Sequence, residues 1–505
     1  MSRMQNAVRN TVFGLFLKVY QILLPFVMRT VMLHTLGIEY LGLNSLFTSV
    51  LQTLSIAELG ISGAITFSMY DPIAQRDSKR VCALLRLYRL LYAIIGLTVL
   101  VLGAGLIPFL PRLITGEIPA DLNIYILYPM YLISTALSYS LLSYRSSLLE
   151  AHQQNSVISK ITLVTTTVQF TLQILFLLVF KNYYVYILTQ FASQFLNQIL
   201  VYLQVRKRYP QYKPTGSLDK QIVGDIFRKV RDLFTAKVGA IILQASDTIV
   251  ISMFLGLAVL AVYQNYFMIV TAIIAFISTM LSGSLAGIGN SIVTESKEKN
   301  FHDFRRFTFI LSGIVCVCTS CFLVLFQPFM KLWMGEAAML PMGMVILFCI
   351  YFVLYEYNQL FNLYKDAAGM WHEDRFRPLV TSLTNLGLNL FFVTRIGLYG
   401  ILASTVLSML LIGMPWLLHN LFSTLFLRSC RGYLSELFQY LAVTAVTCVA
   451  SYFLNHLLSP EGIPGLILSG LIAVSVSGCT FLAVFRKSPY LKDVLALLRR
   501  LILRR

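Results

Sequence analysis

Long apolar stretches separated by short polar segments run through the whole sequence, and this pattern predicts membrane-spanning helices. A helix needs about 20 predominantly apolar residues to cross the hydrocarbon core of a bilayer. An even number of spans places both ends of the chain on the same side of the membrane. We expect fourteen spans, at residues 11–34, 41–70, 84–110, 121–149, 156–180, 183–205, 232–254, 258–293, 304–328, 340–366, 377–396, 399–422, 435–458 and 463–485.

The longest polar interruption runs from Arg206 to Arg231 and carries eight basic residues against two acidic ones. Charged segments are costly to bury in a bilayer, and a basic excess favours the cytoplasmic side. With this segment placed there, 33 of the 40 lysine and arginine residues fall in predicted cytoplasmic segments and four in external loops. This asymmetry predicts cytoplasmic termini, with the basic final segment LKDVLALLRRLILRR on the membrane surface.

The composition is typical of an all-α polytopic membrane protein, because 57% of the residues are hydrophobic and 12% are charged. The net charge of +18 comes from the loops, as orientation in a membrane requires, so it does not indicate nucleic-acid binding. The external loops are too short for a catalytic domain, and no Walker A, GxSxG or HExxH motif occurs. We therefore expect no enzyme activity, no cofactor and no metal site.

The two halves of the sequence repeat the same spacings. A glycine precedes an arginine by 49 residues and a tyrosine precedes a histidine by eight, in Gly37–Arg86 and Tyr144–His152 and again in Gly256–Arg305 and Tyr364–His372. Parallel repeats of this kind enclose a central cavity in alternating-access transporters. We expect a six-helix lobe, a basic cytoplasmic linker, a second six-helix lobe, and two further helices with a basic tail, at residues 1–205, 206–231, 232–422 and 423–505.

Two stretches carry a family resemblance. Residues 247–263 read DTIVISMFLGLAVLAVY, and residues 36–43 read LGIEYLGL, followed by AELGI at 57–61. The first stretch is similar to the D-x(3)-I/V-x(3)-LG-x(4)-G/A-x-Y pattern of bacterial polysaccharide transporters. These are the O-antigen and capsule repeat-unit flippases of the multidrug/oligosaccharidyl-lipid/polysaccharide exporter superfamily.

The resemblance implies a V-shaped, two-lobed fold in the bacterial inner membrane. It implies that the protein moves an undecaprenyl-diphosphate-linked oligosaccharide from the cytoplasmic to the outer leaflet, in the synthesis of lipopolysaccharide, capsule or exopolysaccharide. The implied partners are this lipid-linked oligosaccharide, membrane lipids, and the polymerase and chain-length machinery of polysaccharide export.

Basic residues inside the spans are the first candidates for substrate binding. Lys18 and Arg29 are eleven positions apart, so they share one face of the first helix to within about 20°. Lys237 lies in the seventh span and Arg145 at the cytoplasmic end of the fourth. These residues can line a cationic cavity that attracts the diphosphate or an acidic sugar. Alternatively, Lys18, Lys237 and Arg145 meet lipid headgroups, and Arg29 has a structural partner.

The acidic residues inside the spans are Glu58, Asp247 and Glu356. Each can couple transport to H⁺ or Na⁺, since a carboxyl group in a low-dielectric interior can exchange protons near neutrality. Each can equally form a structural ion pair with a basic residue of the spans. Asp247 belongs to the family pattern, which favours a packing role for it. The amides of the spans, among them Gln169, Gln194 and Asn197, fit a sugar-sized cavity, although such groups also hold membrane helices together.

Three transport functions remain open at this stage. The leading one is a flippase for a lipid-linked oligosaccharide, and the nearest alternative is a multidrug or organic-cation antiporter of the same superfamily. A cation exporter requires acidic cavity walls, whereas the candidate lining here is basic. A lipid II flippase shares both the basic lining and the helix number, so the sequence does not exclude it.

Overall fold

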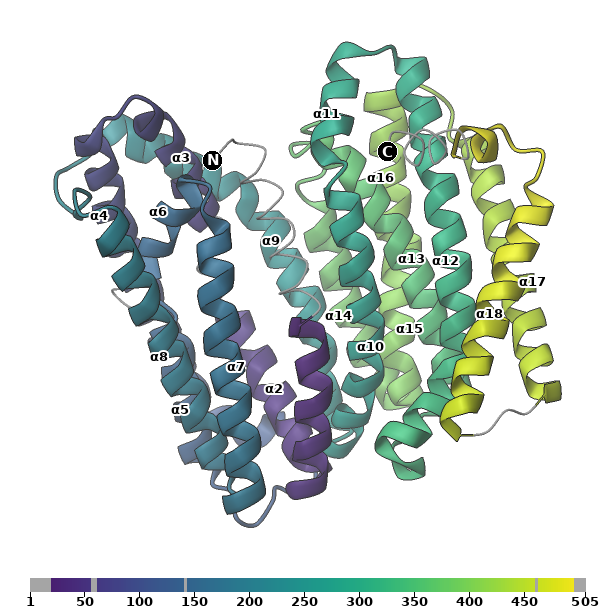
Figure 1. The fold of residues 1–505 in the computed structure, drawn as a ribbon, viewed down its shortest axis with the longest axis horizontal. Coiled ribbons are helices and arrows are strands. Elements are labelled where there is room, and N and C mark those ends of the chain that lie inside the picture. Colours follow the sequence, from purple (N-terminus) through teal and green to yellow (C-terminus); the bar gives the residue numbers. More distant parts are fainter. Residues whose placement is uncertain (1–19, 56–60, 140–142, 459–461, 495–505) are drawn as a thin grey trace. The chain divides into compact units, whose positions relative to one another are not determined.

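The computed structural model describes residues 20–55, 61–139, 143–458 and 462–494, and within these ranges the chain is helical and contains no strand (Figure 1). The predicted all-α membrane fold is confirmed, whereas the number fourteen is not. Nine helices of the described ranges are long and apolar enough to cross a bilayer. They are Ser78–Leu113, Asn155–Phe180, Leu257–Thr294, Lys297–Met334, Met342–Ala367, Arg377–Ile396, Leu398–Phe426, Arg431–Leu458 and Gly462–Val484.

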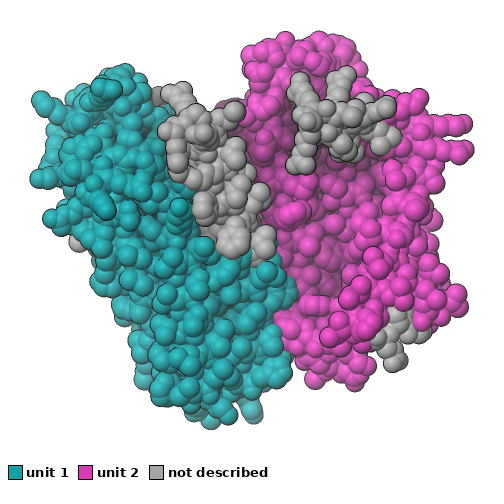
Figure 2. Space-filling view, in the orientation of Figure 1, with its two compact units in different colours: residues 1–261 teal, residues 262–505 magenta. Residues whose placement is uncertain are grey.

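The chain divides into two compact units, residues 1–261 and residues 262–505, which Figure 2 shows in different colours. The four-part division expected from the repeat stays a prediction. The first described helix of unit 1 covers residues 20–35. Its other elements are α2 (Ile38–Leu54), α3 (Ile61–Ala74), α4 (Ser78–Leu106), η2 (Ile107–Leu113), α5 (Ile124–Leu137), η3 (Ser143–Arg145), α6 (Ser146–Ala151), α7 (Asn155–Phe180), α8 (Tyr183–Arg208) and α9 (Lys220–Phe254).

Helices α7 and α8 form the tightest hairpin of unit 1. Lys181 ends α7 in the left-handed conformation, with φ 48°, and the next residue caps α8. The Asn182 side-chain oxygen accepts hydrogen bonds from the backbone N–H groups of Tyr184 and Val185, at 2.9 and 3.3 Å. Such a cap satisfies amide groups that the first helical turn leaves unpaired. A two-residue connection therefore reverses the chain without exposing backbone groups to lipid.

The predicted span 121–149 is not one helix. Helix α5 ends at Leu137, where the Ser138 hydroxyl donates a hydrogen bond to the Thr135 carbonyl at 2.6 Å. Serine hydroxyls compete in this way with the backbone bonds of a helix. The next described helical residues begin at Ser143, in η3 and then α6. Ser138, Ser143 and Ser146, on either side of this break, line the same pocket of unit 1.

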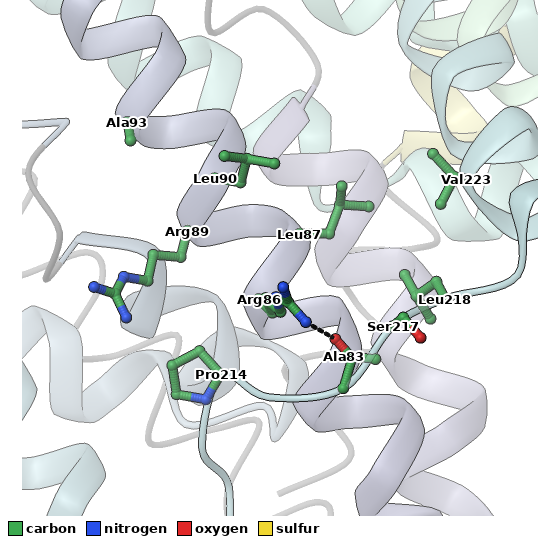
Figure 3. A pocket seen from close by; sticks show the side chains of 11 residues that line it. Ala83, Arg86, Leu87, Arg89, Leu90, Ala93, Pro214, Ser217, Leu218 and Val223 are labelled. Atoms are coloured by element: carbon green, nitrogen blue, oxygen red, sulfur yellow. Dashed lines mark hydrogen bonds between the residues drawn. The ribbon is translucent and has the colours of Figure 1, made fainter.

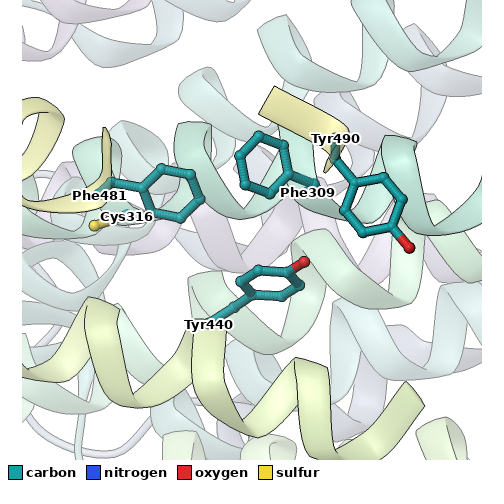
Figure 4. Close-up of a cluster of buried hydrophobic side chains, with 5 residues drawn as sticks. All are labelled: Phe309, Cys316, Tyr440, Phe481 and Tyr490. Carbon is teal, nitrogen blue, oxygen red and sulfur yellow. The ribbon is translucent and has the colours of Figure 1, made fainter. Parts of the chain in front are cut away.

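Unit 2 is organised around α12 (Lys297–Met334), which contacts α13 (Met342–Ala367), α17 (Arg431–Leu458) and α18 (Gly462–Val484). Figure 4 shows the aromatic cluster that joins three of these helices, with Phe309 and Cys316 of α12, Tyr440 of α17 and Phe481 of α18. Tyr490, beyond α18, packs on Phe309 with ring centroids 6.1 Å apart. The last two helices are thus part of the core of unit 2.

The remaining helices of unit 2 pack beside α12 and α13. Helix α10 begins within unit 1 and continues into unit 2, and α15 is followed by two π-helical segments. Such segments carry more residues per turn than an α-helix. Their bounds are α10 (Leu257–Ser282), α11 (Leu285–Thr294), α14 (Arg377–Ile396), α15 (Leu398–Ser408), η5 (Met409–Gly413), α16 (Met414–Asn420) and η6 (Leu421–Phe426).

Two glycines of the family pattern allow close backbone contacts within unit 1. A Cβ atom added at Gly42 of α2 would lie 2.1 Å from the Leu257 carbonyl oxygen. Gly256 has φ +91°, and an added Cβ there would lie 2.9 Å from the Thr115 carbonyl oxygen. Beside it, the Ser252 hydroxyl donates to the Leu113 carbonyl at 2.7 Å. Small residues permit such approaches between membrane helices, so these glycines serve packing.

We predict that Gly42→Ala destabilises the protein by about 1–3 kcal/mol, because the methyl group forces α2 away from Leu257. Gly63→Ala is the matched control, since nothing lies within 4 Å of a Cβ at that position of α3. Thermal unfolding of the purified protein in detergent measures the difference. Equal melting temperatures for the two variants would contradict the close contact.

Candidate functional site

A pocket of about 300 Å³ lies within unit 1, and nearly all of the residues that line it are polar and uncharged. We call it the polar pocket. Ten of its eleven side chains carry a hydroxyl or carboxamide group and none is charged. The residues are Ser138, Ser143, Ser146, Thr165, Thr166, Gln169, Ser193, Gln194, Asn197, Gln198 and Val201.

Most of the polar pocket is formed by one face of α7 and the face of α8 that packs against it. Thr165, Thr166 and Gln169 recur at helical spacing on α7, and the residues from Ser193 to Val201 do so on α8. The Ser193 hydroxyl donates to the Thr165 carbonyl at 2.9 Å. The Asn197 amide donates to the Thr165 hydroxyl, also at 2.9 Å. These bonds fix the two helices against each other and hold the lining in place.

The structure brings together Gln169, Gln194 and Asn197, which the sequence had singled out as sugar-sized cavity residues. The serines and threonines of the lining were missed, although their spacing on α7 and α8 was a visible signal. A lining of neutral donors and acceptors binds ligands that are themselves rich in hydroxyl groups, because every buried polar atom needs a partner.

Arg29 is half-buried in the first helix of unit 1. Its Nη2 atom donates to the Ala261 carbonyl at 3.5 Å. Its predicted companion Lys18 lies outside the described residues, and so does the side chain of Lys237. A cationic cavity built from these three residues therefore stays a prediction.

Arg145 ends η3, between Ser143 and Ser146 of the polar pocket. Its guanidinium lies 4.3 Å from the ring centroid of Tyr202, and its Nε atom donates to the Tyr144 hydroxyl at 3.1 Å. Cation–π contacts of this kind hold an arginine in place while leaving N–H groups for an anion. Arg145 thus supplies a positive charge between two residues in the sequence that line the uncharged polar pocket.

Of the three predicted acidic residues, the structure describes Asp247 and Glu356. Glu58 lies outside the described residues, and Asp247 is buried in α9 of unit 1. Glu356 is fully buried in α13 of unit 2, and neither of its carboxyl oxygens has a hydrogen-bond partner in the described part of the chain. A buried carboxylate without a partner is costly. Its role in coupling or pairing stays a prediction.

Other charged groups near the predicted cytoplasmic helix ends make local contacts. Arg377 of α14 binds Asp374 through two bonds, of 2.6 and 2.7 Å, and Asn362 of α13 at 2.8 Å. His152 stacks on Tyr209 with ring centroids 4.2 Å apart, and burial lowers the pKa of its imidazole. Arg377 links α13 to α14, whereas the His152 contact fixes the loop that follows α8.

A family model described as "Polysaccharide biosynthesis protein" matches residues 7–286, which is more than half of the sequence. The chain belongs to this family. The family resemblance expected from the sequence is therefore confirmed. No curated protein matches the sequence.

Solved structures share the fold at low sequence identity. An inward-facing multidrug resistance MATE family transporter of the MOP superfamily has 14% identity and a TM-score of 0.65, over 80% of this chain and 96% of that one. The lipid II flippase MurJ, in an inward closed conformation, has 13% identity and a TM-score of 0.67, over 95% and 99%. A MOP superfamily transporter from Pyrococcus furiosus has 14% and 0.55, over 82% and 94%. The chain is a multi-pass membrane protein with a transporter fold.

We predict that Glu356→Met raises the free energy of unfolding by about 1–3 kcal/mol, because it replaces a buried carboxyl group that has no partner in the described ranges with an apolar side chain of similar size. Glu356→Asp, which keeps the carboxyl group, is the control and is not expected to stabilise. Thermal unfolding in detergent tests both variants. A lower melting temperature for Glu356→Met would show that the carboxyl group has a stabilising partner.

Proposed function

We propose that this protein transports a lipid-linked oligosaccharide across the membrane and binds its sugar part in the polar pocket of unit 1. The observation that carries the proposal is the lining of that pocket, ten hydroxyl and carboxamide side chains with no charge among them. Sugars present hydroxyl groups in all directions, and each can exchange hydrogen bonds with such a lining. Membership of a polysaccharide biosynthesis family supports this class of cargo.

The same lining argues against an organic-cation antiporter. A cation binds to carboxylates or to aromatic faces, and the polar pocket contains neither. Arg29 and Arg145 add positive charge to unit 1 instead, which attracts the diphosphate of a lipid carrier and repels a cationic drug. The proposed cargo is an undecaprenyl-diphosphate-linked repeat unit, moved from the cytoplasmic to the outer leaflet of the bacterial inner membrane. The proposed partners are the polymerase and chain-length machinery of polysaccharide export.

The proposed transport needs a source of free energy, and the chain has no nucleotide-binding motif. We propose that Glu356 of unit 2 binds the coupling ion, H⁺ or Na⁺. Two features support this role, its complete burial and the absence of a hydrogen-bond partner for either oxygen among the described residues. Ionisable residues in this situation mark ion and proton pathways in membrane proteins.

We predict that Arg29→Ala slows clearance of the lipid-linked repeat unit by roughly tenfold or more, which corresponds to the loss of one charge-assisted interaction. Arg29→Lys keeps the charge and is expected to retain part of the activity. Arg112→Ala, in a predicted external loop, is the matched control. The measurement is mass spectrometry of undecaprenyl-linked intermediates in a strain deleted for the protein and complemented with each variant.

Each outcome of that experiment decides between the functions. Accumulation of a complete repeat unit in the deletion strain, cleared by wild type and by Arg112→Ala but not by Arg29→Ala, supports the proposal. Accumulation of lipid II instead would identify a lipid II flippase. If no lipid-linked sugar accumulates and sensitivity to cationic drugs rises, the protein is an antiporter.

We predict that the double variant Gln169→Leu/Asn197→Leu also slows clearance, by about 30-fold, because each lost hydrogen bond to the sugar contributes about 1 kcal/mol. Gln221→Leu, an exposed position on α9, is the control for loss of an amide. The same assay measures both, with protein levels matched by immunoblot. Normal clearance by the double variant would place the sugar elsewhere.

A further inference from the structure

Unit 1 has a second cavity, of about 560 Å³. Its lining is mostly aliphatic, whereas that of the polar pocket is mostly polar. This second cavity lies where the first turns of α4 meet residues 214–218 and the beginning of α9, and we call it the α4 groove (Figure 3). The sequence predicts that this part of the chain faces the cytoplasm. Leucine, valine, alanine and proline make up most of its lining, and no acidic residue is among them.

Two arginines supply the positive charge of the α4 groove. Figure 3 shows Arg86 and Arg89 on the same helix, with Leu87, Leu218 and Val223 to one side of them. The Arg86 Nη1 atom donates to the Gly216 carbonyl at 2.8 Å, which holds the guanidinium at the groove. Because a guanidinium has five N–H donors, this bond leaves others for an anion. Arginine binds phosphate through two such donors at once.

An apolar stripe continues from the arginines along α4. Leu90, Ile94, Leu97 and Val101 are 58%, 52%, 63% and 62% exposed in the structure. Together with Arg86 they fall within an arc of about 80° of the helix. From Leu90 to Val101 the helix rises about 16 Å, which is close to the depth of one leaflet, about 15 Å. The stripe therefore matches the length of an acyl chain that begins at the membrane surface.

The geometry points to an anionic glycerophospholipid of the cytoplasmic leaflet as the ligand of the α4 groove. Its phosphate binds Arg86 and Arg89, and one acyl chain lies along the stripe from Leu90 to Val101. A sugar is a poor fit, because a stripe of exposed aliphatic side chains offers no hydrogen bonds. The bound lipid anchors residues 214–218, which connect α8 to α9, to the membrane surface. This site is independent of the proposed cargo.

The test compares lipids that differ only in the headgroup. The full-length protein is purified in detergent and titrated with dioleoyl phosphatidylglycerol or dioleoyl phosphatidylcholine, and bound lipid is counted by native mass spectrometry. Wild type is expected to retain one phosphatidylglycerol in preference to phosphatidylcholine. Arg86→Gln/Arg89→Gln is expected to bind it roughly 30-fold more weakly, which corresponds to about 1 kcal/mol for each arginine near a membrane surface.

The control is Arg206→Gln/Lys207→Gln, which removes two exposed charges from the end of α8 outside the groove and is expected to bind like wild type. Equal binding of the two lipids by wild type would overturn the proposal, even if the arginine variant failed to fold. So would an equal loss in the control variant, which would indicate a general charge effect. Displacement of phosphatidylglycerol by equimolar undecaprenyl phosphate would show that the groove prefers the carrier lipid, and would also overturn it.

Discussion

Every backbone amide and carbonyl group inside a bilayer must find a partner within the protein, because hydrocarbon offers none. This constraint explains why the described chain is built from helices and why its turns are capped by side chains such as Asn182. It applies equally to polar side chains. In unit 1, hydroxyl and amide groups of α7 and α8 form hydrogen bonds with one another across the hairpin. The other polar groups of these helices line a pocket and can form hydrogen bonds with a ligand in the same way.

The two cavities of unit 1 differ in chemistry. The polar pocket offers neutral hydrogen bonds, whereas the α4 groove offers fixed positive charge beside an aliphatic surface. Because the groove lies against the connection between α8 and α9, occupancy by lipid acts on the segment that links the hairpin to the rest of the chain.

The sequence was sufficient to predict the helical membrane fold and the family. The lengths of the apolar stretches, the basic residues of the loops and the order of the family motifs all indicate the same fold, and they are spread over the chain. It placed α7 and α8 within three residues of their observed bounds, at 156–180 and 183–205. It did not predict the end of α5 at Leu137, where a serine hydroxyl competes for a backbone carbonyl, or the π-helical segments after α15. Nor could it show that Glu356 has no hydrogen-bond partner among the described residues, because that depends on which residues of other helices face it.

The aromatic cluster of unit 2 has a practical consequence for handling the molecule. Phe309, Phe481 and Tyr490 lie on α12, on α18 and in the segment beyond it, so the tail folds back onto a helix far earlier in the sequence. A reporter or affinity tag fused directly after α18 would remove Tyr490 and uncover the face of Phe309. Expression vectors should therefore keep the chain through residue 494 and attach the fusion partner beyond it.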